Sequence, residues 1–406
     1  MTYDIAAVRA QFPALEAGSA HFDGPAGTQT PRPVIDAVAE ALANPLSNRG
    51  RVTTGERNAE TIVAEARRAL ADLLGADPAA VVFGRSATQL AYDFSRTLAK
   101  TWTPGDEVVV SRLDHDANIR PWVQAAAVVG ATVRWADFDP ATGELTPDHI
   151  SAVLTGRTRL VAVTAASNLI GTRPAIAEIS RRVHAAGALL YVDGVHCTAH
   201  AHVDIDRLGA DFLTCSPYKF LGPHLGVLAS RPEILETLRP DKLLPSPDAD
   251  PERFEFGTLP YEFLAGARAA VDFLAGLDPS AGGDRRKRLA ASFVALERYE
   301  DSLRLRLEGG LASFAAITVH SRAAHRTPTL LLTIDGRDTA DAHRFLAARG
   351  VDAPSGSFYA LEASRRLGLG DAGGLRVGLA PYTSADEVDR LLNGLSDFLR
   401  KPVTHL

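Results

Sequence analysis

The stretch LLYVDGVHCTAHAHVDIDRLGADFLTCSPYKFLGPHLGVLAS (189–230) holds the strongest indication of how this chain folds. One apolar strand in it ends at Asp193, and a second, DFLTCS (211–216), leads into Lys219, 26 residues after the aspartate. Parallel strands end at a common edge of their sheet, and ligands bind in the crevice there. We therefore expect Asp193 and Lys219 to face the same crevice.

Similar segments lie on both sides of this stretch, where apolar, β-branched runs alternate with helix-like ones. Strands are indicated at 81–85, 106–111, 131–138, 159–167 and 188–195, and helices at 60–76, 87–102 and 174–187. This alternation predicts an α/β fold with a mostly parallel sheet flanked by helices.

The last third of the chain is organised differently. A Pro- and Asp-rich loop is expected at 239–254 and a long helix at 259–277, and from about residue 290 a helix, a strand and a further helix follow. We predict two domains. The large domain comprises residues 21–275, and the small α/β domain comprises residues 1–20 and 276–406.

Composition excludes several classes of protein. The 406 residues carry a formal net charge of −6, which argues against a nucleic-acid binder or a surface held to anionic lipid. No apolar run is long enough to span a membrane, and the N-terminus lacks the pattern of a secretory signal. Two cysteines cannot form a disulfide framework or a thiolate zinc site. We expect a cytoplasmic protein without a metal, nucleic-acid or membrane partner.

Lysine is scarce in this chain, with five residues among 43 Lys and Arg, as in proteins from GC-rich genomes. Any chemistry that needs an amine nucleophile therefore has few candidates. Lys100 and Lys287 lie in polar, helix-like surroundings, Lys242 in a loop and Lys401 near the end of the sequence. Lys219 alone ends an apolar strand, where desolvation favours the neutral, nucleophilic amine.

Asp193 and Lys219 together match what pyridoxal 5′-phosphate requires. This cofactor needs a lysine for its Schiff base and an acid that keeps its ring nitrogen protonated. A surface lysine and a helix-capping aspartate are the commoner interpretations of each residue alone. Other strand ends add support: Thr88 opens a helix whose N–H groups could hold a phosphate, although N-capping explains it equally well. His115 could stack on a flat cofactor, and Asn168 adds a polar group at the same edge.

Seven motifs, in order, resemble one known family: GRSAT, DHDANIRPW, SNLIGT, VDGVH, SPYKFLGPHLGVL, RFEFGT and LRVGLAPYTSADEVDRLL. They are similar to the class V aminotransferase family of fold-type I pyridoxal-phosphate enzymes, and specifically to its cysteine desulfurase branch. The resemblance covers about residues 20 to 398. It implies a large domain with a mostly parallel sheet and a smaller C-terminal α/β domain.

The resemblance implies a role for each matching residue. Lys219 would form the Schiff base, Asp193 would bind the pyridine nitrogen, and His115 would stack on the ring. Asn168 and His196 would lie near the phenolic oxygen of the cofactor, His196 where relatives often have Gln. The phosphate-binding positions would be Ala87, Thr88, Ser216 and Tyr218, with Tyr218 in place of the usual His. Thr258 would bind the phosphate of the neighbouring subunit. This last role implies a homodimer with its active site at the interface.

The resemblance also implies a substrate site. Arg376 matches the arginine that binds the carboxylate of an amino acid, a role that suits the fork of a guanidinium. The segment FDGPAGTQTP (22–31) resembles the loop that walls the substrate pocket, where Ala26 and Gly27 leave room.

The chain departs from the cysteine desulfurase pattern at one point. Desulfurases take sulfur from the substrate with a cysteine on a mobile loop, but the corresponding stretch here is PSGSFYALE (354–362), with Tyr359 at the cysteine position. Cys197 and Cys215 lie in or next to strand motifs and are expected to be buried core thiols. A persulfide route is hard to run without a mobile nucleophile.

We therefore predict a pyridoxal-phosphate enzyme that acts on an amino acid, with C–S β-elimination from cysteine or a cysteine S-conjugate as the favoured reaction. An S-conjugate releases its own thiol and needs no acceptor cysteine, and Phe358 and Tyr359 suit a large, less polar substituent. A transaminase, an epimerase, a decarboxylating or oxidative deaminase and a cysteine desulfurase remain alternatives on the same scaffold. A non-enzymatic protein is disfavoured because both Lys219 and Arg376 are present.

Overall fold

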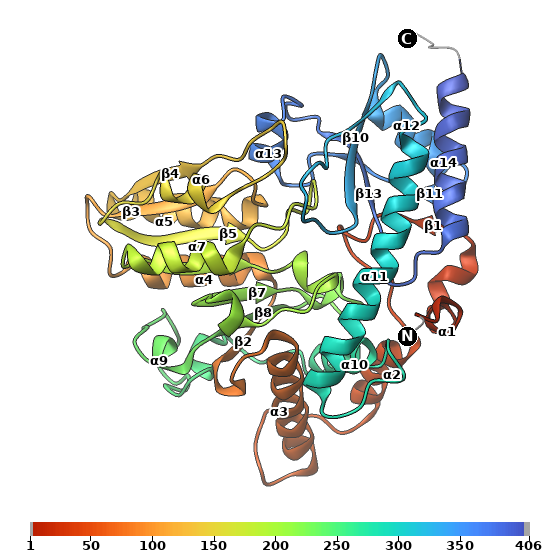
Figure 1. Ribbon diagram of the computed structural model, residues 1–406. Coiled ribbons are helices and arrows are strands. Elements are labelled where there is room, and N and C mark those ends of the chain that lie inside the picture. Colours follow the sequence, from red (N-terminus) through yellow and green to blue (C-terminus); the bar gives the residue numbers. More distant parts are fainter. Residues whose placement is uncertain (1–2, 402–406) are drawn as a thin grey trace.

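A seven-stranded sheet forms the centre of the computed structural model, which describes residues 3–401 (Figure 1). The strand order is β2-β8-β7-β6-β5-β3-β4, and β8 alone runs antiparallel to its neighbours in this sheet. The strands are β2 (Val81–Gly84), β3 (Glu107–Ser111), β4 (Thr132–Ala136), β5 (Thr158–Thr164), β6 (Leu189–Asp193), β7 (Phe212–Cys215) and β8 (Gly226–Ser230). The predicted α/β fold with a mostly parallel, helix-flanked sheet is confirmed.

Helices cover both faces of this sheet because its strands are apolar on both sides. Val109 points into a core shared with α3 and α10, whereas its neighbours Val108 and Val110 point into a second core with α4 and α5. Buried runs of this kind, rather than alternating ones, are typical of parallel strands. The covering helices are α3 (Thr54–Leu74), α7 (Ile176–Ala185) and α10 (Tyr261–Ala275) on one face, and α4 (Ala87–Ala99) and α5 (Arg120–Val129) on the other.

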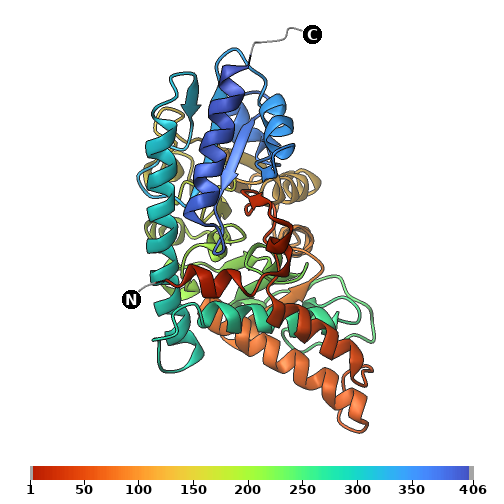
Figure 2. The same ribbon diagram turned by 90° about the vertical axis from the view of Figure 1, so that its right-hand side faces the viewer.

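A second, antiparallel sheet lies in the C-terminal part, in the order β12-β13-β10-β9. Its strands are β9 (Ile317–Val319), β10 (Thr329–Ile334), β12 (Ser355–Gly356) and β13 (Gly374–Gly378), and its own core includes α11 (Arg285–Leu311), α12 (Thr339–Ala347) and α14 (Ala385–Arg400). Figure 2 shows α11 beside α14 and running on toward the large sheet.

The N-terminal segment joins this second unit through backbone pairing. The short strand β1 (Ala20–His21) pairs in parallel with β11 (Val351–Asp352). The remaining helices are α1 (Ile5–Arg9), α2 (Arg32–Ala43), α6 (Pro147–Ser151), α8 (Ile205–Leu208), α9 (Pro232–Leu235) and α13 (Leu361–Arg366). Turns of 3-10 helix lie at η1 (Pro13–Ala17), η2 (Pro78–Ala80), η3 (Asp116–Asn118), η4 (Cys197–Ala199), η5 (Pro217–Lys219) and η6 (Glu252–Phe254).

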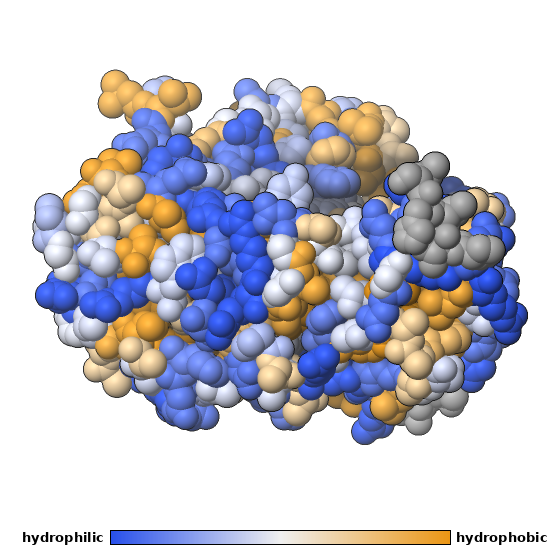
Figure 3. All heavy atoms as spheres, turned by 90° about the horizontal axis from the view of Figure 1, so that it is seen from above, coloured by the Kyte–Doolittle hydropathy of each residue, from blue (hydrophilic) through white to orange (hydrophobic). Residues whose placement is uncertain are grey.

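The surface of the described chain is mixed in character. Figure 3 shows one face on which hydrophilic residues surround separate apolar patches. Among residues 3–401, no helix combines the length and apolar character needed to cross a membrane.

Candidate active site

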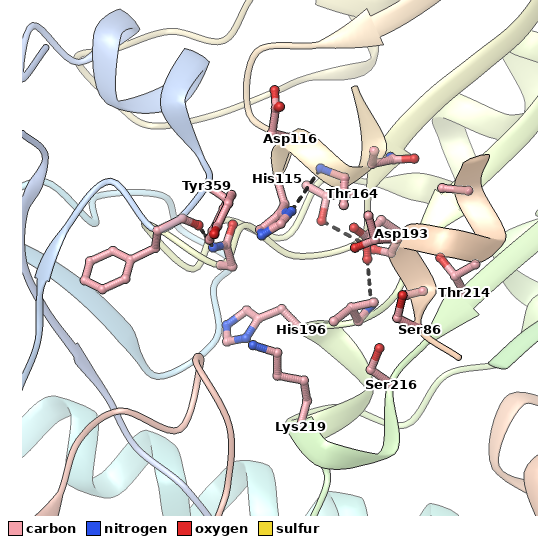
Figure 4. Close-up of a pocket in the computed structure, with 18 of the residues that line it drawn as sticks. Ser86, His115, Asp116, Thr164, Asp193, His196, Thr214, Ser216, Lys219 and Tyr359 are labelled. Atoms are coloured by element: carbon pink, nitrogen blue, oxygen red, sulfur yellow. Dashed lines mark hydrogen bonds between the residues drawn. The ribbon is translucent and has the colours of Figure 1, made fainter. Parts of the chain in front are cut away.

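A cavity of about 780 Å³ lies where β5, β6 and β7 end and is closed on one side by residues of the C-terminal unit. Most of the predicted site residues line it, and Figure 4 shows His115, Asp193, His196 and Lys219 around one space. The predicted residues in its lining are Ala26, Ala87, Thr88, His115, Asn168, Asp193, His196, Ser216, Tyr218, Lys219, Tyr359 and Arg376.

Two predicted residues lie outside this lining. Gly27 is just behind it, where a Cβ atom would lie 3.4 Å from the ring of Tyr218. Thr258 is exposed in the loop that follows η6 and does not reach the cavity of its own chain.

Asp193 is the last residue of β6 and is 8% exposed. Burial raises its pKa to about 6, although the nearby charge of Lys219 lowers it. Its Oδ1 atom accepts a hydrogen bond of 2.8 Å from the backbone N–H of Val195, which fixes the carboxylate at the strand end. A carboxylate held in this way can share a proton with a ring nitrogen in the cavity.

Lys219 ends η5, which follows β7 directly. Burial and the positive charge of Arg376 lower its pKa to about 7, and Asp193 and Asp23 oppose the shift. Its Nζ atom donates to the backbone carbonyl of Pro25, in the N-terminal loop. A large fraction of Lys219 is therefore a neutral amine near pH 7, and a neutral amine can act as nucleophile or base.

His115 lies at the N-cap of η3, after β3. Its Nδ1 atom accepts a hydrogen bond of 3.0 Å from the backbone N–H of Ala117, so the neutral ring carries its proton on Nε2. Burial, together with the charges of Lys219 and Arg376, lowers its pKa to about 4. The imidazole is thus a neutral, oriented ring on which a flat molecule can stack.

The neighbouring residue Asp114 fixes the segment that carries His115 through hydrogen bonds. Sequence analysis did not identify this residue. Asp114 is fully buried, and its Oδ1 atom accepts a hydrogen bond of 2.6 Å from Asn118, which in turn accepts one of 3.1 Å from Trp122. Burial raises the pKa of Asp114 to about 8. The position of an acidic residue next to a predicted site histidine could have indicated a supporting role for Asp114. The sequence alone does not show, however, that its side chain points into the protein.

Two of the predicted phosphate-binding residues, Ala87 and Thr88, lie at the N-terminus of α4. Ser86 caps this 13-residue helix by accepting a hydrogen bond of 3.1 Å from the N–H of Gln89, and Ala87 and Thr88 open toward the cavity with Ser216. A Cβ atom on Gly226 would lie 2.3 Å from the backbone of Ser86, so only glycine lets β8 come this close. The free N–H groups and the dipole of a helix N-terminus favour a phosphate.

Arg376 lies on β13 of the second sheet and is 1% exposed. Its Nη1 atom donates to the carbonyl of Asn168 at 3.0 Å, and its Nε atom has no hydrogen-bond partner. Within residues 3–401, no carboxylate lies within salt-bridge distance of it. Burial lowers its pKa to about 9. A buried guanidinium without a counter-ion is costly, so this position is suited to an anionic ligand.

Asn168 and His196 occupy the edge of the cavity between the two sheets. The Nδ2 atom of Asn168 donates to the carbonyl of Phe358 at 2.9 Å, so the amide holds the loop above the site. His196 is bound through Nε2 to the hydroxyls of Thr327 and Thr329, at 2.9 and 3.1 Å, while its buried Nδ1 atom has no partner. An unpaired ring nitrogen in the cavity wall can accept or donate a hydrogen bond to a ligand.

These residues fit pyridoxal phosphate on the evidence of their own chemistry. The cavity offers a helix N-terminus for a phosphate, a flat neutral imidazole, a buried carboxylate for a ring nitrogen and a lysine with a lowered pKa. The orphaned Nδ1 atom of His196 and Oδ1 atom of Asn168 add unsatisfied polar groups in the same wall.

Neither cysteine reaches this site. Cys197, in η4, and Cys215, on β7, are both buried, and burial raises the pKa of each thiol. The prediction that both are core thiols is confirmed. Tyr359, the residue that we predicted at the cysteine position of desulfurases, is 76% exposed at the cavity wall, and its ring stacks on His115.

Comparison with known proteins finds similarity over nearly the whole chain. The model of the family described as Aminotransferase class-V matches residues 20–391. The uncharacterized protein MT3887 of Mycobacterium tuberculosis is 34% identical over 405 residues, which cover 98% of this chain and 99% of that protein. A cysteine desulfurase of Dickeya dadantii is 32% identical, over 97% of this chain and 96% of the relative.

A solved structure shares the fold over nearly the full length. The crystal structure of the cysteine desulfurase CsdA from Escherichia coli matches with a TM-score of 0.86 and 27% sequence identity, covering 98% of this chain and 99% of that one.

Proposed function

The chain belongs to the class V aminotransferase family, a family of pyridoxal-phosphate enzymes, and from this premise we propose that it cleaves the C–S bond of cysteine or a cysteine S-conjugate by β-elimination. The products are a thiol, pyruvate and ammonia. The proposal includes pyridoxal phosphate as the cofactor of this chain.

The observation that carries the proposal is the chemistry of the cavity wall beside His115. Lys219 and Arg376 supply an amine and a carboxylate site for an amino acid, as in a desulfurase-like enzyme. In residues 3–401, however, both thiols are buried and none lines the cavity. Sulfur therefore has no protein acceptor there and would leave with its own substituent, which is the outcome of an elimination.

The residues of this chain divide the work as follows. Arg376 binds the substrate carboxylate, and Lys219, as a neutral amine, takes the proton from Cα. Bound cofactor supplies a sink for the electron pair left on that carbon. With the cofactor bound, Asp193 would keep a proton at its ring nitrogen, and His115 would cover the ring and exclude water. The C–S bond then breaks, sulfur leaves with the electron pair as a thiolate, and water hydrolyses the remaining three-carbon fragment to pyruvate and ammonia.

We further propose that the protein is a homodimer. Thr258 lies in an exposed loop with Phe256, which is 45% exposed, and Leu244 is 96% exposed in the preceding loop. A second copy would cover these apolar side chains and would receive the Thr258 hydroxyl at its phosphate site. The oligomeric state of the purified protein by light scattering tests this proposal, and a stable monomer contradicts it.

A substrate panel on purified, cofactor-loaded protein tests the reaction. The panel contains cysteine, cystine, several cysteine S-conjugates, alanine and aspartate, and the assays detect pyruvate, sulfide and free thiol. We expect pyruvate and thiol in equal amounts from at least one S-conjugate. If no sulfur substrate yields either product, the elimination is wrong. A keto-acid-dependent recovery of the cofactor spectrum would indicate a transaminase instead.

Two lysine variants test whether the cofactor is attached to Lys219. Lys219→Ala should abolish the visible absorption of the bound cofactor, whereas Lys287→Ala, a change at a lysine whose side chain is 76% exposed, should leave it unchanged. Visible absorption that persists in Lys219→Ala would show that the cofactor is attached elsewhere.

A further inference from the structure

The loop over the active site, residues 354–362, is fixed to the large sheet rather than free. The backbone N–H of Asp116 donates to the carbonyl of Tyr359 at 2.7 Å, and Asn168 donates to the carbonyl of Phe358 at 2.9 Å. Just after them, Glu362 accepts hydrogen bonds from Arg112 and Arg120 at 2.6 and 2.8 Å. Four polar contacts thus connect this loop to segments that follow β3 and β5.

The conformation of this loop is costly by itself. Phe358 and Tyr359 have φ angles of +53° and +58°, in the left-handed region that bulky L-residues avoid. Two successive residues of this kind persist only where the surrounding contacts over-determine them. The four contacts to the large sheet supply that constraint, so the loop is built to hold the two aromatic residues in place.

The two rings have different positions in the site. The ring of Phe358 lies 3.7 Å from the Cζ atom of Arg376, so it covers one face of the guanidinium and leaves the edge for a carboxylate. The ring of Tyr359 stacks on His115, with 5.5 Å between the ring centroids and an angle of 29° between the planes. It is nevertheless 76% exposed, so much of its surface is uncovered at the cavity wall.

From this arrangement we propose that Tyr359 is a specificity residue that binds an aromatic substituent on the sulfur of the substrate. The proposal rests on the function proposed above and names its substrate class, cysteine S-conjugates with an aryl or heteroaryl group. Arg376 and Tyr359 line the same cavity, so a substrate with its carboxylate on Arg376 has Tyr359 available as a wall for the substituent on sulfur. A fixed aromatic face there favours a flat ring over a saturated group of equal size.

Three substrates distinguish the effect of aromatic stacking on binding from the effect of substituent size: S-phenyl-, S-cyclohexyl- and S-methyl-L-cysteine. The proteins are the cofactor-loaded wild type, Tyr359→Phe, which keeps the aromatic face, and Tyr359→Leu, which keeps an apolar side chain without it. Binding is measured by calorimetry, and thiol release gives KM and kcat. Glu362→Ala releases the loop from Arg112 and Arg120 without altering a residue that touches the substrate.

We expect the wild type to prefer the phenyl over the cyclohexyl conjugate by about 3- to 10-fold in Kd, the range of one aromatic contact. Tyr359→Phe should keep this preference, and Tyr359→Leu and Glu362→Ala should lose it. Glu362→Ala should keep kcat for the methyl conjugate within about twofold of the wild type. If Tyr359→Leu retains the preference, or weakens all three conjugates equally, the proposal is wrong. If the preference survives in Glu362→Ala, the anchored loop does not create it.

The two proposals fail separately. Phenyl binding that depends on Tyr359 without release of thiol would refute the elimination and leave the substrate class standing. Thiol release without a preference for aryl conjugates would refute the role of Tyr359 and leave the elimination standing.

Discussion

Replacing Lys219 with methionine should make the cofactor-free protein more stable at low pH. Methionine is unbranched like lysine, is shorter by the terminal amine and carries no charge. In the wild type, the ammonium group shares the cavity wall with the positive charge of Arg376 and is turned toward the carbonyl of Pro25. The fold therefore carries the cost of burying a lysine that the proposed reaction requires, and the variant removes that cost.

The size and sign of the effect follow from the pKa of Lys219. In an unfolded chain a lysine has a pKa near 10.4, and in the folded protein burial lowers it to about 7. Below pH 7 the amine is charged in both states, so the full cost is present. Between pH 7 and 10 the unfolded chain holds more protons, so the wild type gains stability as pH rises. Allowing for the partial exposure of the side chain, we expect a cost on the order of 3 kcal/mol at pH 6.

Urea unfolding of cofactor-free protein at pH 6, 7.5 and 9 measures this cost. The free energy of unfolding of Lys219→Met should exceed that of the wild type most at pH 6, and the gap should narrow at each higher pH. Lys287→Met, at a lysine whose side chain is 76% exposed, serves as the control and should show no such trend. A gap that is absent at pH 6 or constant across the three values would refute the assignment of Lys219 as a desolvated amine.

Further changes test the rest of the site and its support. Arg376→Lys should raise KM for the best substrate by roughly 10- to 100-fold in steady-state assays, because an ammonium group cannot bind a carboxylate through two parallel hydrogen bonds; an unchanged KM would place the carboxylate elsewhere. Replacing Cys197 and Cys215 together with alanine should leave kcat for thiol release within about twofold, since both thiols are buried; a complete loss would revive a persulfide route. Glu255→Ala should lower the free energy of unfolding by about 3–5 kcal/mol in urea, because it leaves Arg67, which Glu255 binds at 2.7 and 2.8 Å, buried without its partner; a loss below 1 kcal/mol would contradict this.

The sequence predicts those parts of the fold in which an apolar run marks a strand and the parallel sheet determines where that strand ends. Strand β6 is an apolar run that ends in Asp193, and its position in a parallel sheet determines where that carboxylate lies. Strand direction was not predictable for β8, whose residues Gly226–Ser230 are buried on both faces whichever way they run. Strand β1 pairs through only two residues with β11, more than 300 residues away, and no local pattern signals such a contact.

The site residues likewise differ in how far the sequence predicts their positions. His115, Asn168 and Lys219 follow strands of one sheet, so their common location follows from topology. Arg376 belongs to the other sheet, and the sequence indicated it through family resemblance alone. The hydrogen bond between Lys219 and Pro25 joins segments 194 residues apart, and nothing in either segment predicts it.

The electrostatics of the cavity couple the two residues that we propose to act on the substrate, Lys219 and Arg376. Burial lowers the pKa of both Lys219 and Arg376, and the positive charge of Arg376 lowers the pKa of Lys219 further. A carboxylate at Arg376 supplies the missing counter-ion and so removes the positive field that favours a neutral Lys219. In the proposed reaction, binding of the substrate would therefore raise the basicity of Lys219 for the step in which it takes the proton from Cα. In this proposal, binding of the carboxylate at Arg376 promotes proton abstraction by Lys219, and neither step needs a thiol.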